Sequence, residues 1–206
     1  MSLTTYTELK TTIANWLDRD DLTAKIPTFI SLAEAEFDRA LRHWRMEIRA
    51  NANINSRYTA LPADFLETIR FHLDADERVL DLVTPLSLQK KRFQAADATG
   101  TPECYSVIAG AYEVYPTPDT GYTGQIYYYA KTARLSDAVA TNWILTNYPD
   151  AYLYGSLIHT APYLMDDARI AVWTALHQNA ISGINGNNDT AKYGGSGLRM
   201  QINSYS

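Results

Sequence analysis

The chain has 206 residues, of which 46% are hydrophobic and 20% are charged, so it holds enough apolar side chains for a packed core and is not a mainly disordered protein. Its formal net charge of −5, without a dense basic patch, excludes a protein whose main task is to grip nucleic acid, because such binding depends on neutralising phosphates. The single cysteine, Cys104, excludes an intrachain disulfide and fits a reducing cytoplasm.

Two amphipathic helices are predicted in the N-terminal part of the chain. The first runs from Thr5 to about Leu17, and Thr5 and Glu8 have the spacing of a capping box. The second runs from about Pro27, a residue favoured in the first turn of a helix, to about Trp44. Apolar residues recur in both segments with the 3.6-residue period of a helix that has one buried face.

The segment 46–145 changes to a β pattern, in which apolar and polar residues alternate between turn-forming residues. One short helix is predicted within it, opening at Thr84-Pro85. The strand signal is strongest at 124–131 (GQIYYYAK), where Tyr127 to Tyr129 put aromatic surface on both faces of the strand, so we expect both faces to be covered. The predicted strands span 46–54, 58–61, 67–73, 79–83, 103–109, 112–115 and 124–131.

The last part of the chain returns to helical patterns. One helix is predicted at 148–165, with a kink at Pro162 because the proline ring removes a backbone hydrogen bond. A second helix follows Asp166-Asp167 and ends near Ile184. The remaining residues, 187–206, are rich in glycine, asparagine and serine and lack apolar periodicity, so they are predicted to form a flexible tail.

This order of helices, strands and helices predicts an α+β fold with segregated layers. The terminal helices, 1–45 and 146–186, are expected to form one helical bundle. Residues 46–145 are expected to form an inserted antiparallel β domain, and 187–206 the tail.

The segment 142–164 (NWILTNYPDAYLYGSLIHTAPYL) has no acidic or basic side chain after Asp150, apart from one histidine. It is too short to cross a bilayer, which needs about 20 apolar residues, and too apolar all round for a helix with one wet face. Two interpretations remain open: a central helix within a monomer, or a surface that a neighbouring subunit covers. The candidate subunit-interface residues are Tyr152, Tyr154, Gly155, Ile158 and Trp173.

Candidate catalytic and metal-binding residues are few. No pair of histidines has the i, i+4 spacing of a helical metal site, so the sequence indicates no metal and no other cofactor. A small hydrolase could use Ser156 and His159, one helical turn apart, together with Asp150. No nucleophile-elbow motif surrounds Ser156, however, and a serine in the middle of a helix is more typical of close packing.

The only basic cluster is Lys90-Lys91-Arg92, within the predicted short helix. A solvated helix face is the simplest interpretation of such a cluster, and a phosphate contact is the alternative.

Four segments together carry a resemblance that extends along most of the chain. They are YTELKTTIANWLDRDDLTAKIPTFISLAEAEFDRALR at 6–42, YTALPADFLE at 58–67, GTPECYSVIAGAYEVYPTPDTGYTGQIYYYAKTARLSD at 100–137 and NWILTNYPDAYLYGSLIHTAPYLMDDARIAVW at 142–173. In this combination and order they resemble the head-to-tail adaptor proteins of tailed bacteriophages, in the group typified by the SU10 adaptor.

The resemblance implies a non-enzymatic component of the virion neck, made in the cytoplasm of the host bacterium. Such adaptors form a ring, typically a dodecamer, that binds the portal protein, docks tail or nozzle proteins and leaves a channel for DNA. The resemblance implies neither contact with a membrane nor specific binding to DNA. Members of the family commonly engage the portal through a C-terminal segment, which here implies residues 186–206. The candidate portal-binding residues are Tyr193, Leu198, Arg199, Met200 and Ile202.

Two other functions remain open at this stage. The chain could be another neck component, such as a stopper or a tail-completion protein, or it could be a small hydrolase built around Ser156 and His159. In the ring interpretation, the acidic excess of each subunit is repeated around the channel. A channel with negative potential would repel DNA phosphates and let the duplex slide through.

Overall fold

The computed structural model describes residues 3–74, 78–96, 98–164 and 168–194. Two compact units make up the chain: a helical unit, formed by residues up to Arg45 and from Thr132 onward, and a β unit, Met46–Lys131. The mixture of helices with largely antiparallel sheets is an α+β fold, as the sequence predicts.

The helical unit contains five α-helices within the described residues. Three short 3-10 turns accompany them, of which η1 joins the first two helices, η2 follows the second, and η3 precedes the last. Their bounds are α1 (Tyr6–Leu17), η1 (Asp20–Lys25), α2 (Ile26–Ala40), η2 (Trp44–Met46), α4 (Trp143–Asn147), α5 (Pro149–Ile158), η3 (Ala161–Tyr163) and α6 (Arg169–Tyr193).

The start of α1 confirms the predicted capping box. Oγ1 of Thr5 accepts a hydrogen bond from the N–H of Glu8, at 3.3 Å, and the Glu8 carboxylate accepts one from the N–H of Thr5, at 3.1 Å. The reciprocal pair satisfies two of the backbone donors that a helix leaves open at its first turn. The second helix was predicted to end near Trp44, and this prediction is wrong by four residues. α2 ends at Ala40, because Leu41 adopts an extended conformation.

The predicted helix at 148–165 is shorter in the structure. α5 ends at Ile158, and Pro162 does not kink it but lies in the separate turn η3. The last helix is longer than predicted, since α6 continues past Ile184 to Tyr193 and so includes the first seven residues assigned to a tail. Tertiary contacts explain the extension: Ile184 and Asn188 are buried, and Oδ1 of Asn188 accepts a 2.8 Å hydrogen bond from the N–H of Trp44.

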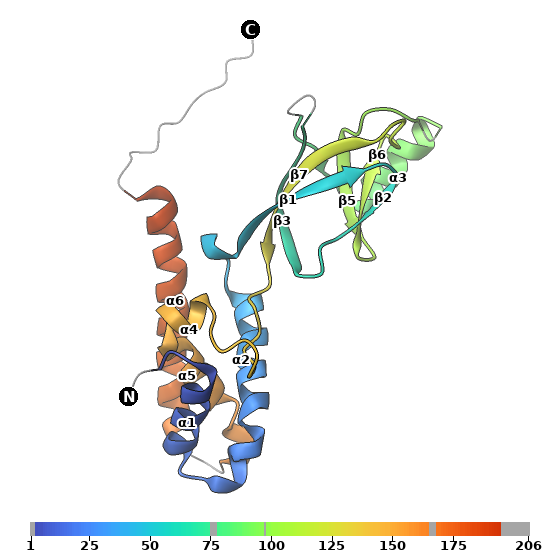
Figure 1. Ribbon diagram of the computed structural model, residues 1–206. Coiled ribbons are helices and arrows are strands. Elements are labelled where there is room, and N and C mark those ends of the chain that lie inside the picture. The colour runs from blue at the N-terminus through green and yellow to red at the C-terminus, as the bar shows by residue number, and fades with distance from the viewer. Residues whose placement is uncertain (1–2, 75–77, 97, 165–167, 195–206) are drawn as a thin grey trace. The chain divides into compact units, whose positions relative to one another are not determined.

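Helix α5, in which Asp150 of the first turn is the one acidic side chain, lies at the centre of the helical unit, where it packs against α1, α2, α4 and α6 (Figure 1). Its approach to α6 is close: a Cβ added to Gly155 would lie 2.9 Å from Cε1 of His177, so only glycine fits there. Within the described residues, α5 is therefore a central helix of its own subunit, and coverage of its exposed residues by a neighbouring subunit stays a prediction. The buried residues of α5 are Ala151, Tyr152, Leu153, Gly155, Ser156 and Leu157.

The β unit holds two sheets. One has three antiparallel strands in the order β1-β7-β3, and the other has four strands in the order β2-β6-β5-β4. The strand pairs are antiparallel as predicted, except that the short β4–β5 pair at one edge is parallel. The bounds are β1 (Glu47–Ile54), β2 (Tyr58–Ala60), β3 (Phe65–Leu73), β4 (Asp81–Leu82), α3 (Pro85–Gln94), β5 (Cys104–Ile108), β6 (Ala111–Tyr115) and β7 (Tyr122–Ala130).

The two sheets enclose one aromatic core. The fully buried ring of Phe71 packs on Tyr105 and Tyr112, with ring centroids 5.4 and 5.3 Å away. From β7, Tyr128 points into this core and is buried, whereas its neighbour Tyr127 is half-buried and stacks on a histidine of β3. Both faces of β7 therefore carry aromatic contacts, but only one is fully covered within the described residues.

The Phe71→Ala variant should lose about 3–5 kcal/mol of unfolding free energy, because it removes a fully buried ring and leaves a cavity between the two sheets. Urea denaturation followed by the near-UV circular dichroism of the aromatic residues would measure the loss. The matched control is Phe93→Ala, since the Phe93 side chain is 79% exposed and its removal should change the free energy by only about 0.5 kcal/mol. Equal losses in the two variants would contradict this description of the core.

Candidate functional site

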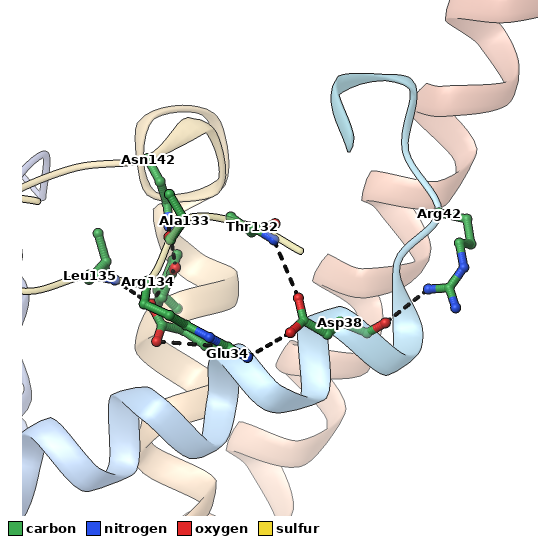
Figure 2. Close-up of polar contacts among 9 residues, drawn as sticks. Glu34, Asp38, Arg42, Thr132, Ala133, Arg134, Leu135 and Asn142 are labelled. Carbon is green, nitrogen blue, oxygen red and sulfur yellow. Dashed lines mark hydrogen bonds and ion pairs between the residues drawn. The ribbon is translucent and has the colours of Figure 1, made fainter. Parts of the chain in front are cut away.

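Two carboxylates of α2 hold the segment that re-enters the helical unit after the β unit (Figure 2). Oδ2 of Asp38 lies 2.6 Å from Nη2 of Arg134, and Oδ1 accepts a 3.4 Å hydrogen bond from the N–H of Thr132. One turn earlier on α2, Oε1 of Glu34 accepts a 2.7 Å hydrogen bond from the N–H of Leu135. These bonds explain why residues 132–145 belong to the helical unit, although the sequence pattern assigned them to the β insertion.

The same network reaches α5 through a buried phenol. The hydroxyl of Tyr152 donates a 3.2 Å hydrogen bond to Oε1 of Glu34 and accepts one of 2.6 Å from Nδ2 of Asn142. Nδ2 of Asn142 also donates to the carbonyl of Ala133, at 2.8 Å, and its Oδ1 caps the first turn of α4. Burial raises the pKa of both the Tyr152 hydroxyl and the Glu34 carboxyl. The cluster is thus a hydrogen-bonded structural junction of α2, α4, α5 and the re-entering segment.

A second polar cluster joins α2, α5 and α6. Nε2 of His177 lies 3.3 Å from Oε1 of Glu36, and Nε2 of His159 lies 3.8 Å from Oε2 of the same carboxylate. The pKa of His159 is lowered, mainly because burial disfavours its charged form and also because His177 and Arg39 repel the charge, against the opposing attraction of Glu36.

The residues considered for a hydrolase do not form a catalytic arrangement. Ser156 is fully buried, and its Oγ makes no hydrogen bond to any residue that the structure describes. No histidine among those residues is therefore placed to activate it. Asp150 is exposed in the first turn of α5, where an acidic side chain favours the helix N-terminus.

The basic cluster of α3 contains one structural residue and two exposed lysines. Arg92 is buried, with Nε 3.1 Å from Oε1 of Glu113 and Nη1 donating to Oγ1 of Thr117 at 2.8 Å. Arg57 binds the same carboxylate at 2.7 Å. The solvated-face interpretation is therefore wrong for Arg92, which joins α3 to β6, while Lys90 and Lys91 lie on the exposed surface.

Across residues 3–74, 78–96, 98–164 and 168–194, no three His, Cys, Asp or Glu side chains are placed to hold a metal ion. In the same ranges, no helix has the length and apolar character that crossing a membrane requires.

The candidate interface residues separate into two groups. Tyr152, Gly155 and Trp173 are buried among the described residues of their own subunit. Tyr154 and Ile158 are half-buried and keep some exposed surface. The assignment of all five residues to a subunit interface stays a prediction. Among the candidate portal-binding residues, Tyr193 ends α6. The other four, Leu198, Arg199, Met200 and Ile202, lie outside the described residues.

An exposed apolar surface adjoins Tyr154. The ring of Tyr154 contacts the ring of Trp16 in α1, with centroids 6.0 Å apart, and Nη1 of Arg169 donates a hydrogen bond to the carbonyl of Trp16 at 3.2 Å. Val172 and Leu176, three and seven residues beyond Arg169, lie on the same side of α6 and are exposed, Val172 by 57%. We call these five residues the Trp16 face. Sequence periodicity missed it because it combines residues from three helices.

Comparison with known proteins identifies one related family. The family model described as SU10 adaptor protein matches residues 4–201, which include both units and extend beyond the end of α6. No curated protein matches the chain.

Titration of His159 should lower the unfolding free energy of the helical unit as the pH falls from about 7.5 to 5, while Glu34, whose pKa is raised by burial, contributes in the opposite direction. Because the pKa of His159 is lower in the folded chain than its ordinary value of 6.5, its contribution is fully present above 6.5 and is lost as the pH falls through the folded value. Chemical denaturation followed by helical circular dichroism would show a shallower decline for His159→Asn. An unchanged decline in His159→Asn would contradict the assignment.

The Ser156→Ala variant should be as stable as the wild type or more stable by up to about 1 kcal/mol, because it removes a buried hydroxyl that lacks a partner in the described structure. The matched control is Thr160→Val, which removes a buried hydroxyl that donates a 2.6 Å hydrogen bond to the carbonyl of Leu157 and should cost about 1 kcal/mol. Thermal unfolding compares the two. A hydrolase would instead lose its activity in Ser156→Ala, and that loss would overturn the structural role.

Proposed function

Because the chain belongs to the SU10 adaptor protein family of phage head-to-tail adaptors, we propose that it forms a ring, typically of twelve copies, between the portal and the tail in the virion neck. One side of the ring binds the portal, the other docks tail or nozzle proteins, and the centre leaves a channel for DNA. The match across residues 4–201 is the observation that carries this proposal, since it covers nearly the whole chain.

The surface of the helical unit supports a ring. A closed ring needs two different faces on each subunit that meet head to tail. The Trp16 face offers an apolar patch with a cation in it, and none of the described residues covers the exposed parts of Val172 and Leu176. We therefore assign the Trp16 face to one of the two lateral contacts.

The charge of the subunit supports a channel that DNA crosses without being held. Each copy carries a net charge of −5, so a ring accumulates acidic excess. The buried pairing of Arg92 with Glu113 also removes one of the few clustered cations from the set that could bind phosphate. Repulsion of the phosphates would keep the duplex mobile in the channel.

Mixing the purified chain with assembled portal should give a coaxial ring on the portal, seen by cryo-electron microscopy and counted by mass measurement. The Val172→Asp variant should fail to form it, because the new charge would have to be buried in the lateral contact. Thr11→Asp is the matched control, since it adds the same charge at an exposed position of α1 outside the Trp16 face. A monomer without portal is compatible with the proposal, whereas a chain that never binds the portal contradicts it.

A further inference from the structure

Helix α3 is covered on one side only within the described residues. Its ten residues, Pro85–Gln94, pack against β5 of the β unit (Figure 1). Leu88 and Arg92 are its buried residues, and Leu88 lies in a small apolar cluster with Cys104 and Tyr115. Because residues four apart share one face of a helix, Leu88 and Arg92 mark the side of α3 that rests on the sheet.

The opposite side of α3 also carries apolar side chains. At 3.6 residues per turn, the side chains that lie about half a turn away from the buried pair are those of Leu86, Lys90 and Phe93. Leu86 is 62% exposed, and Phe93, at 79%, has the largest exposed fraction among the large apolar side chains of the described residues. We call Leu86, Lys90 and Phe93 the α3 face. A helix that is apolar on both sides has a second side to bury against a partner.

A hollow adjoins the α3 face at each end of the helix. At the first turn lies the open groove of the β unit, which has a volume of about 520 Å³, is mostly apolar and is lined in part by Val83, Thr84 and Pro85. At the last turn lies a smaller pocket of about 280 Å³. The two hollows make the exposed side of α3 part of a longer contoured surface, which is the shape that receives a segment of another protein.

The smaller pocket combines an aromatic wall with two guanidinium groups. Its lining residues are Arg57, Gln89, Arg92, Phe93 and Ala96, and no carboxylate is among them. Arg57 and Arg92 are held in place by the carboxylate of Glu113, at 2.7 and 3.1 Å. Fixed guanidinium groups beside an aromatic ring suit a carboxylate that is attached to an apolar neighbour.

The charge of α3 is opposite to that of the chain as a whole. Its sequence, PLSLQKKRFQ, contains three basic residues and no acidic one, whereas the chain carries a net charge of −5. Lys90 and Lys91 are exposed. A positive surface on an acidic protein attracts an acidic partner and sets the orientation in which that partner binds.

The mixture of apolar and basic side chains favours a protein over DNA as the occupant. Binding to DNA depends on many cations that neutralise phosphates, and the α3 face has one cation between two large apolar side chains. A second copy of the chain is not complementary through the Trp16 face, because that surface also combines apolar side chains with a cation, Arg169. The α3 face therefore fits a different protein, one that presents apolar and acidic side chains together.

We propose that the α3 face docks a segment of a tail protein in which apolar and acidic side chains alternate or adjoin. Leu86 and Phe93 contact the apolar side chains of that segment, Lys90 pairs with one carboxylate, and a second carboxylate enters the pocket beside Arg57. The inference rests on the proposed function, which includes the docking of tail or nozzle proteins, and it adds the docking surface and the chemistry of the partner.

Titration of portal-bound rings with the purified tail protein of the same phage tests this assignment, with binding followed by biolayer interferometry. Phe93→Ala should weaken binding by a factor of about 30, as expected for the loss of a central aromatic anchor. Lys90→Glu should weaken binding about tenfold at low salt and reduce the dependence of binding on salt, because repulsion replaces a charge pair.

The matched controls lie in the same unit and outside the α3 face. Ile69→Ala removes an apolar side chain that is 44% exposed on β3, and Lys131→Glu reverses an exposed charge at the end of the unit. Both should bind the tail protein as the wild type does. Near-UV circular dichroism of each variant checks that the β unit is folded before binding is compared.

The outcomes separate this inference from the proposed function. Rings that form on the portal and bind the tail protein equally well with Phe93→Ala and Lys90→Glu would overturn the inference and leave the proposed function standing. Loss of ring formation in Phe93→Ala would also overturn it, because the α3 face would then belong to a neighbouring copy or to the portal. Weaker binding of duplex DNA to Lys90→Glu rings, with tail binding unchanged, would overturn it in favour of a phosphate contact. A wild-type chain that forms no ring on the portal would overturn both.

Discussion

The helical unit depends on one buried carboxylate, Glu34, which accepts hydrogen bonds from the re-entering segment and from α5 at the same time. Without it, the N–H of Leu135 and the hydroxyl of Tyr152 would each lose a buried partner, at a cost of about 1–3 kcal/mol for each group. Asp38, one turn further along α2, reinforces the junction by binding Arg134. The junction therefore fixes where the chain re-enters the helical unit and holds the central helix in place.

Because most of α5 is covered within one subunit, the proposed assembly depends mainly on surfaces outside this helix, and Tyr154 in the Trp16 face is the exception. Among the surfaces that the described residues leave incompletely covered are the exposed apolar residues of the Trp16 face and the open groove of the β unit. One lies on the helical unit and the other on the β unit, next to the α3 face. The proposed assembly assigns the Trp16 face to a neighbouring subunit and the α3 face to a tail protein.

Local signals in the sequence predicted what depends on neighbouring residues. The capping box at Thr5 and the α+β order were confirmed, and the four quoted segments lie within the range of the family match. Long-range contacts produced the differences. α6 continues through a segment rich in glycine and asparagine because Asn188 is bonded to the backbone of Trp44, far away in the sequence. Tyr152 was predicted at an interface because the segment around it has the same apolar sequence whether its own helices or a neighbouring subunit cover it.

Hydrogen exchange measured on the free subunit and on the portal-bound assembly tests the central claim most directly. That claim is that each helical unit completes its own core and that the subunits meet elsewhere. The amides of α5 should be strongly protected in the free subunit and gain nothing on assembly, while those on the exposed side of α6 should become protected. Weak protection of α5 in the free subunit, with a large gain on assembly, would contradict the account.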